Sequence, residues 1–274
     1  MQRQRAGRPY FNVTYLTTPK ATSRGRLDSV QRSRTLGSIG IAWFCLTLAA
    51  IAYATRLGLF LAPVDALQGN VFRIFFYHVP HSMLSLLFPY VNFIASLCYL
   101  YWRRRDPLKA LNADAVAISS AEVTVVYASI CLWTGMLWGR VEWGIWWTWD
   151  PRLTSMLLLW LLYVSYLMLR KLSSTGQTHT LAAVLSVFAA IDVPIVYMSI
   201  QWWRTQHPAP VFFSSDPNAG VDKSMYPAWF WNLGAWAMWG IFLVVFRYAL
   251  ERRRQASEQD AALQAIEASL EMAK

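Results

Sequence analysis

Apolar residues gather into six long segments along this chain, separated by shorter polar stretches. The segments run approximately over residues 39–60, 79–102, 113–137, 153–170, 180–203 and 229–248. Each can cross a hydrocarbon core of roughly 30 Å. Because a chain inside a bilayer must satisfy its backbone polar groups within its own helix, the pattern predicts an all-α, polytopic membrane protein with six transmembrane helices.

Basic residues between these segments predict the orientation of the chain. The N-terminal arm, the second and fourth loops and the C-terminal region hold nineteen Lys and Arg, and the other three loops hold six. Since basic loops stay on the cytoplasmic side, both termini should be cytoplasmic. The same short blocks account for the formal charge of +10, so we expect no nucleic-acid partner, which would need one basic face on a folded domain.

The chain divides into three parts by composition. Residues 1–37 are expected to be a basic cytoplasmic arm, with a mitochondrial presequence as the minor alternative. Residues 38–248 form the six-helix domain. Residues 249–274 are expected to be a charged cytoplasmic helix, an extension of the last span with Leu263, Ile266 and Leu270 at helical spacing.

Tryptophan is unevenly distributed in this hydrophobic chain. Of the fifteen tryptophans, five fall in residues 138–150, within a predicted outer-face loop, 138–152. An aromatic belt at the membrane surface explains one or two of them. Five rings in one loop favour a flat, largely apolar ligand, and Gly139 and Gly144 would let the backbone bend beneath it.

Two histidines are predicted on the same face as this loop. His78 lies at the start of the second apolar segment and His207 follows the fifth. A single histidine near a membrane surface is more often a hydrogen-bonded structural residue, but two imidazoles on either side of an aromatic floor can fill both axial positions of a haem iron. His78 and His207 are therefore the candidate metal ligands. His81 is the alternative to His78, and His179 falls on the inner side.

Haem propionates need cations near the water boundary. The outer loops provide four arginines, Arg73, Arg140, Arg152 and Arg204, of which we favour Arg73 and Arg152. Asp150 is expected to cap a helix that begins at Pro151, which leaves the Arg152 side chain free to pair with a carboxylate.

Other polar and thiol groups in the apolar segments have simpler interpretations. Glu122 and Asp192 are expected to make hydrogen bonds between helices rather than a proton path. Cys45, Cys98 and Cys131 form no CxxC motif and are expected to pack as small apolar residues. No nucleotide-binding or zinc-peptidase motif is present, so we expect no enzyme, and any ATP hydrolysis should belong to a partner.

Three motifs together resemble a known family. The stretch from Trp143 to Thr154 resembles the "WWD" signature of the haem-handling proteins of cytochrome c maturation. The stretches 73–80 and 202–207 resemble the two histidine motifs of one branch, the haem exporter protein C (cytochrome c maturation protein C) family. The resemblance covers roughly residues 60–210, with the motifs in the same order and at the same spacing. Pro151, where alanine is common, is one departure from the family pattern.

The resemblance implies a protein of the bacterial inner membrane that takes part in cytochrome c-type biogenesis. Such a protein holds haem b at the periplasmic face, with the iron between two histidines, and presents it to a membrane-anchored haem chaperone for covalent attachment. The implied partners are the ATPase and permease subunits of an ABC transporter and a small single-helix subunit. Carried over by position, the haem-binding residues are His78, His207, Trp143, Trp146, Trp147, Trp149, Asp150 and Arg152.

Two other functions stay open. As the membrane subunit of an ABC haem exporter, the chain would translocate haem through the bundle, and polar residues should line several helices. As a haem enzyme acting on quinone, it should hold histidine pairs deep in the membrane, and no histidine lies near the middle of a predicted helix.

Overall fold

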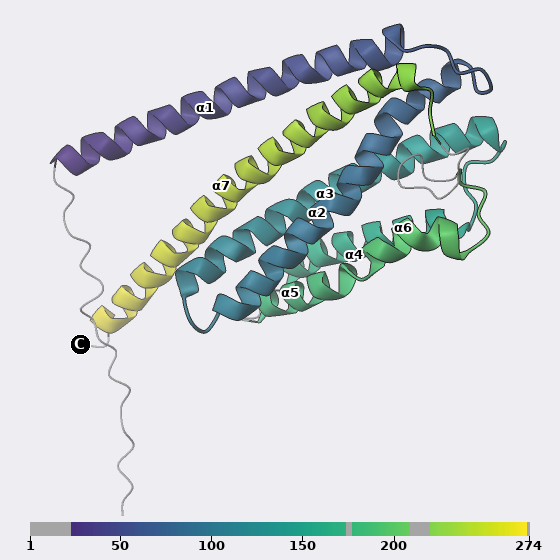
Figure 1. Cartoon of the computed structure of the whole chain (residues 1–274). Coiled ribbons are helices and arrows are strands. Elements are labelled where there is room, and N and C mark those ends of the chain that lie inside the picture. The colour runs from purple at the N-terminus through teal and green to yellow at the C-terminus, as the bar shows by residue number, and fades with distance from the viewer. Residues whose placement is uncertain (1–22, 174–176, 209–219, 273–274) are drawn as a thin grey trace, which may run out of the picture. The chain divides into compact units, whose positions relative to one another are not determined.

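The computed structural model describes residues 23–173, 177–208 and 220–272, and every regular element in them is a helix (Figure 1). The longer helices are α1 (Ser23–Arg56), α2 (Phe75–Trp102), α3 (Pro107–Glu142), α4 (Pro151–Leu172), α5 (Thr178–Ala189), α6 (Asp192–Trp202) and α7 (Tyr226–Met272). Short turns of helix, η2 (Leu57–Leu61), η3 (Asn70–Ile74) and η4 (Lys223–Met225), join them. Six helical spans are long and apolar enough to cross a membrane, with α5 and α6 together making one. The predicted fold class is confirmed.

The fifth span is broken into α5 and α6 at Ala190 and Ile191. Pro194 explains the break, because it has no N–H to donate to the carbonyl of Ala190 and its ring would clash with that carbonyl. The Ile191 N–H turns instead to the Phe188 carbonyl, 3.1 Å away, which tightens the last turn of α5. The prediction of a single uninterrupted helix over residues 180–203 was therefore wrong in this detail.

The N-terminal region differs from its prediction, whereas the C-terminal region agrees with it. Helix α1 begins at Ser23, inside the region predicted to be a basic arm, and residues 1–22 lie outside the described residues. Helix α7 continues without interruption through 249–272, as expected for an extension of the last span. Residues 1–43 and 44–274 form separate units, and every contact reported below lies within the second unit.

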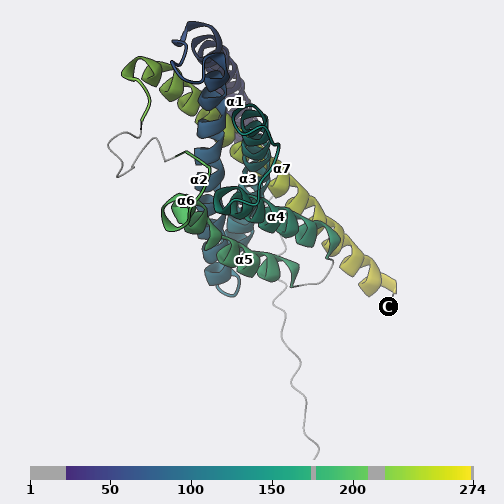
Figure 2. The ribbon, with the colours of Figure 1, turned by 90° about the vertical axis from the view of Figure 1, so that its right-hand side faces the viewer.

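Helix α3 is the central element of this second unit. In Figure 1, α7 lies along one side of the α2–α3 pair and α4, α5 and α6 along the other, and Figure 2 shows these three grouped beside α3. One buried apolar cluster joins α3 to α4, α5 and α6, around Leu159 and Tyr163. A second joins α2 to α3 and is packed against α7, around Phe88 and Tyr127. The helix that both clusters share is held from two sides.

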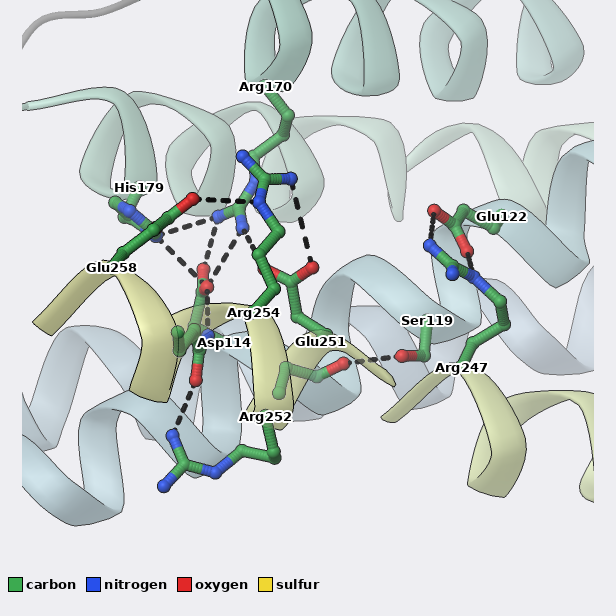
Figure 3. A network of polar contacts seen from close by, with 12 residues as sticks. Asp114, Ser119, Glu122, Arg170, His179, Arg247, Glu251, Arg252, Arg254 and Glu258 are labelled. Atoms are coloured by element: carbon green, nitrogen blue, oxygen red, sulfur yellow. Dashed lines mark hydrogen bonds and ion pairs between the residues drawn. The ribbon is translucent and has the colours of Figure 1, made fainter. Parts of the chain in front are cut away.

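Charged side chains collect where α3 and α5 begin and α4 ends (Figure 3). Asp114 forms a bidentate ion pair with Arg170, whose Nη2 lies 2.9 Å from Oδ2. The Nδ1 of His179 also lies 2.9 Å from Asp114 Oδ2, and Glu251 of α7 lies 3.7 Å from Arg170. His179 thus belongs to this cluster, at the end of the bundle where α3 starts.

The Glu122 carboxylate forms a second ion pair between helices. Arg247 of α7 binds it through Nε and Nη2, the latter at 2.6 Å from Oε1 (Figure 3). The prediction that Glu122 makes an interhelical hydrogen bond is confirmed. Asp192 differs, because its Oδ2 is buried and has no hydrogen-bond partner among the described residues.

Candidate functional site

A cavity opens at the end of the bundle where α3 ends and α4 begins. The cavity is partly open to solvent, and its volume is about 50 Å³. Its histidines, tryptophans and arginine come from three parts of the chain that are far apart in sequence: His78, then Trp138, Trp143, Trp147 and Arg152, and last His207. Cys131, Met136 and Met156 contribute sulfur atoms to an otherwise apolar wall. The fold therefore brings both candidate histidines and three tryptophans to one place.

His78 is held in one tautomer by α3. It lies in the first turn of α2, and its Nδ1 is 2.9 Å from the hydroxyl of Thr134. That hydroxyl donates to the Ile130 carbonyl at 2.7 Å, so its oxygen accepts from the imidazole. The proton therefore sits on Nδ1 and the lone pair on Nε2. Gly135 leaves room for the ring, because a Cβ there would lie 3.1 Å from His78 Cε1.

His207 has the same arrangement without regular structure around it. It follows the end of α6, and its Nδ1 lies 2.9 Å from the carbonyl oxygen of Pro208, which can only accept. The lone pair is again on Nε2. Burial, with the nearby charge of Arg152, lowers the pKa of His207 to about 4, so the imidazole is neutral at neutral pH. In both histidines, an oxygen atom at Nδ1 leaves Nε2 as the nitrogen that could coordinate a metal.

The tryptophan segment is partly helical, which corrects the predicted loop 138–152. Helix α3 continues to Glu142, so Trp138 lies in its last turns and the loop covers only residues 143–150. Gly144 ends the helix with a φ of +73°, the left-handed conformation in which glycine commonly follows a helix. The ring of Trp143 covers Gly139, where a Cβ would lie 3.0 Å from Trp143 Cε3.

The rings of this segment divide between the cavity and its surroundings. Trp138 and Trp143 meet edge to face at 5.1 Å between ring centres, and both line the cavity with Trp147. Trp146 and Trp149 do not line it and are 55% and 74% exposed. A contact between either exposed ring and a ligand in the cavity stays a prediction.

Of the two favoured arginines, only Arg152 reaches the cavity. Its guanidinium lines the wall and donates to the Val196 carbonyl of α6. Arg73 instead donates to the Gly58 carbonyl and to Asn70 Oδ1, each at 3.1 Å. The turn of η3 directs Arg73 toward the beginning of η2, away from the cavity lining.

Asp150 caps α4 as predicted and does not line the cavity. Its Oδ1 accepts the Arg152 N–H at 2.8 Å, with Pro151 at the first helical position. Its Oδ2 accepts the Gln206 N–H at 2.9 Å. The aspartate of the predicted site therefore contacts protein rather than the cavity.

Comparison with known proteins settles the family. The sequence model of the family described as "Heme exporter protein C" (CcmC) matches residues 26–262. Proteins named "Heme exporter protein C" share 40% identity in Bradyrhizobium diazoefficiens, over 64% of this chain and 66% of the relative, and 30% in Escherichia coli K12, over 70% and 77%. The chain belongs to the haem exporter protein C family. The Bradyrhizobium match spans just under two thirds of that relative's length.

The residues matched by the family model include the whole candidate site. The cavity, both histidines and residues 143–150 lie between residues 26 and 262, whereas the last turns of α7 lie beyond it. A further relative of the same name in Haemophilus influenzae is 28% identical over 82% of this chain and 89% of its own length. The resemblance noted from the motifs is confirmed, and the chain is a multi-pass bacterial membrane protein.

His81, the alternative ligand, does not line the cavity. Its Nδ1 lies 2.7 Å from the Tyr77 carbonyl of the same helix. Because a carbonyl oxygen can only accept, Nδ1 is the donor of this hydrogen bond. Its ring is 2% exposed and packs 4.6 Å from Trp236 and 5.2 Å from Tyr127. His81 therefore belongs to the packing between α2, α3 and α7.

From the sequence, Trp138 was expected in the aromatic platform, whereas Cys131 and Gly135 were not expected at the site. Cys131, Gly135 and Trp138 share one face of α3, at the helical spacing of four and three residues. That spacing was visible in the sequence, but the loop assignment of Trp138 hid it. Thr134, which binds His78, and Gln206, whose N–H binds Asp150, belong to no motif that marks them in the sequence.

Proposed function

We propose that this protein holds haem b at the periplasmic face of the bacterial inner membrane and presents it to a membrane-anchored haem chaperone during cytochrome c-type biogenesis. The observation that carries the proposal is the pair of imidazoles, His78 and His207, that line one tryptophan-walled cavity, each with an oxygen atom 2.9 Å from Nδ1, which leaves Nε2 for a metal. Two such donors suit the axial positions of a haem iron.

Haem is the cargo in this proposal, and the chain's residues divide the work of holding it. His78 and His207 would bind the iron, and Trp143 and Trp147 would cover the macrocycle with ring surface. Arg152 is the cation at the wall that would pair with a propionate. The proposed role is holding and handing over, with no catalytic step assigned to the chain.

The handover would take place at the exposed tryptophans. Trp146 and Trp149 lie at 55% and 74% exposure in the loop whose neighbour, Trp147, lines the cavity. Large exposed rings of this kind are favoured anchors of protein interfaces. We therefore assign them to the contact with the chaperone.

The ABC transporter subunits and the single-helix subunit enter as partners through the family. The relatives carry the name of a haem exporter, and this chain has no nucleotide-binding motif. ATP hydrolysis in such a complex would belong to the ATPase subunit.

Holding haem fits the packing better than conducting it through the bundle. Between the cavity and the Asp114 cluster, α3 is packed on one side by Leu159 and Tyr163 of α4 and on the other by Phe88 of α2. Transport of haem into vesicles that contain this chain and an ATPase partner, and its loss when the ATPase is left out, would favour the translocation alternative.

The test is the visible spectrum of the purified protein with His78→Ala, His207→Ala and the double variant. Each single variant should lose most of its haem and stop chaperone loading, because one axial bond is removed. His81→Phe is the matched control, since it changes a histidine of the same helix that lies outside the cavity. A normal Soret band and normal loading in the double variant would show the axial assignment to be wrong.

A further inference from the structure

The segment that carries His207, residues 203–208, makes few hydrogen bonds to the rest of the chain that the structure describes. Two of its hydrogen bonds are internal, from the His207 N–H to Thr205 Oγ1 at 3.0 Å and from His207 Nδ1 to the Pro208 carbonyl. A third joins the Trp203 N–H to Ser199 in the preceding helix α6. Within the described ranges, one hydrogen bond ties this segment to a distant part of the chain, from the Gln206 N–H to Asp150 Oδ2.

Asp150 is placed to hold two segments at once. It is 7% exposed, its Oδ1 accepts the Arg152 N–H and its Oδ2 accepts the Gln206 N–H, 56 residues away in sequence. The Arg152 side chain reaches the Val196 carbonyl of α6. The N-terminus of α4 is therefore hydrogen-bonded both to α6 and to the segment that follows α6.

Capping α4 alone does not account for this geometry. Asp106 caps α3 in the same Asp-Pro context, with Oδ1 accepting the Lys109 N–H at 3.1 Å. Its Oδ2 pairs with the side chain of the same residue, Lys109, at 3.3 Å. A cap thus needs one carboxylate oxygen and local contacts. The second oxygen of Asp150 is used for the distant segment instead.

We propose that Asp150 is a positioning residue for His207, which it acts on through the Gln206 backbone. The inference rests on the proposed haem site. The bond fixes the residue next to the ligand before haem arrives, so that less conformational entropy is lost when the iron binds. Ligand-orienting contacts of this kind typically change metal affinity about 10-fold to 100-fold.

The first test is Asp150→Asn, which keeps an oxygen for the α4 cap but offers an N–H₂ group that cannot accept from Gln206. Haem should dissociate about 10-fold faster, and added imidazole should restore the two-histidine spectrum by replacing the displaced His207. Asp106→Asn is the matched control and should change the rate less than about 2-fold. An unchanged rate in Asp150→Asn, or an equal change in Asp106→Asn, overturns the proposal.

A second pair of variants tests the bond from its other end and leaves the cap intact. Gln206→Pro removes the donating N–H, whereas Gln206→Ala keeps it. Gln206→Pro should reproduce the faster haem loss and the rescue by imidazole, and Gln206→Ala should behave as the parent. Equal behaviour of the two variants overturns the proposal, including where Asp150→Asn itself fails to fold.

Combination with His207→Ala separates this inference from the proposed function. If Asp150 acts through His207, Asp150→Asn should add nothing once His207 is absent, and the two effects should be strongly non-additive. Fully additive effects overturn the positioning role while the haem site stands. A His207→Ala variant that binds haem normally overturns the axial assignment itself, and with it the positioning role.

Discussion

At the scale of single residues, both candidate ligands follow one rule: an oxygen atom holds the Nδ1 proton so that Nε2 is left with its lone pair. For His78 the oxygen is the Thr134 hydroxyl of another helix, and for His207 it is the carbonyl of the next residue. A metal-binding imidazole is usually oriented by such a partner. The site is thus ready for a metal without a change of tautomer.

Thr134→Val should weaken haem binding by about 10-fold, because it removes the acceptor that fixes the His78 ring. Thr124→Val is the matched control. Thr124 lies on the same helix and its hydroxyl makes the same bond to the helix backbone, to the Ser120 carbonyl, but it makes no hydrogen bond to a histidine among the described residues. Haem titration of both purified variants checks the prediction, and equal affinities would contradict it.

The sequence predicted that the two candidate histidines share one site but did not predict every contact around them. His78, His207 and Arg152 were predicted from residue type and side of the membrane, and all three line the cavity. Arg73 shares those properties, yet the local turn of η3 directs it to Gly58. Side of the membrane is set by charge along the chain, whereas side-chain direction depends on turns and partners that residue type does not reveal.

At the scale of helices, close approach between α2 and α7 depends on a glycine. A Cβ at Gly240 would lie 2.7 Å from Phe88 Cε2 and 3.1 Å from the Tyr127 hydroxyl. Gly234, on the same helix, has nothing within 4 Å of a Cβ. The two glycines therefore serve different purposes, and only Gly240 is needed for packing.

Gly240→Ala should lower the unfolding temperature in detergent, with a loss of about 1–3 kcal/mol from overpacking. Gly234→Ala should raise stability or leave it unchanged, because alanine is the better helix former by roughly 1 kcal/mol. Thermal unfolding followed by circular dichroism compares the two. Equal or higher stability of Gly240→Ala would contradict the close packing of α2 on α7.

Helix ends were less predictable than helix positions. All six spans follow from apolar length, but the signals for two boundaries were overlooked. Pro194 marks the break between α5 and α6, and Gly144 marks the end of α3 at Glu142. The long apolar run led to the prediction of one helix across Pro194, and the cluster of tryptophans led to the prediction of a loop that began before Gly144.

At the scale of the whole second unit, the two ends of the bundle carry different chemistry. The cavity with its two histidines lies where α3 ends, and the Asp114–Arg170–His179 cluster lies where α3 begins. A buried charge is tolerated only where it is paired and hydrogen-bonded, which this cluster achieves across α3, α4 and α5. One end thus offers a ligand site and the other locks the helices together.

The orientation of these ends decides which compartment the cavity faces. In a chain without Cys45, Cys98 and Cys131, single cysteines can be placed at Leu67, which is 97% exposed, and at Ser269 in the exposed end of α7. Leu67 precedes Gln68, whose side chain binds Trp138 at the cavity wall, so it reports the cavity side.

Leu67→Cys should react with a membrane-impermeant maleimide in intact spheroplasts, and Ser269→Cys only after the cells are permeabilised. The reason is the excess of Lys and Arg, nineteen against six, on the side that includes both termini. Each variant is the other's control for reagent access. The reverse pattern would place the cavity in the cytoplasm, where a periplasmic chaperone has no access to it, and presentation of haem to that partner would then be wrong even if both histidines bind the iron.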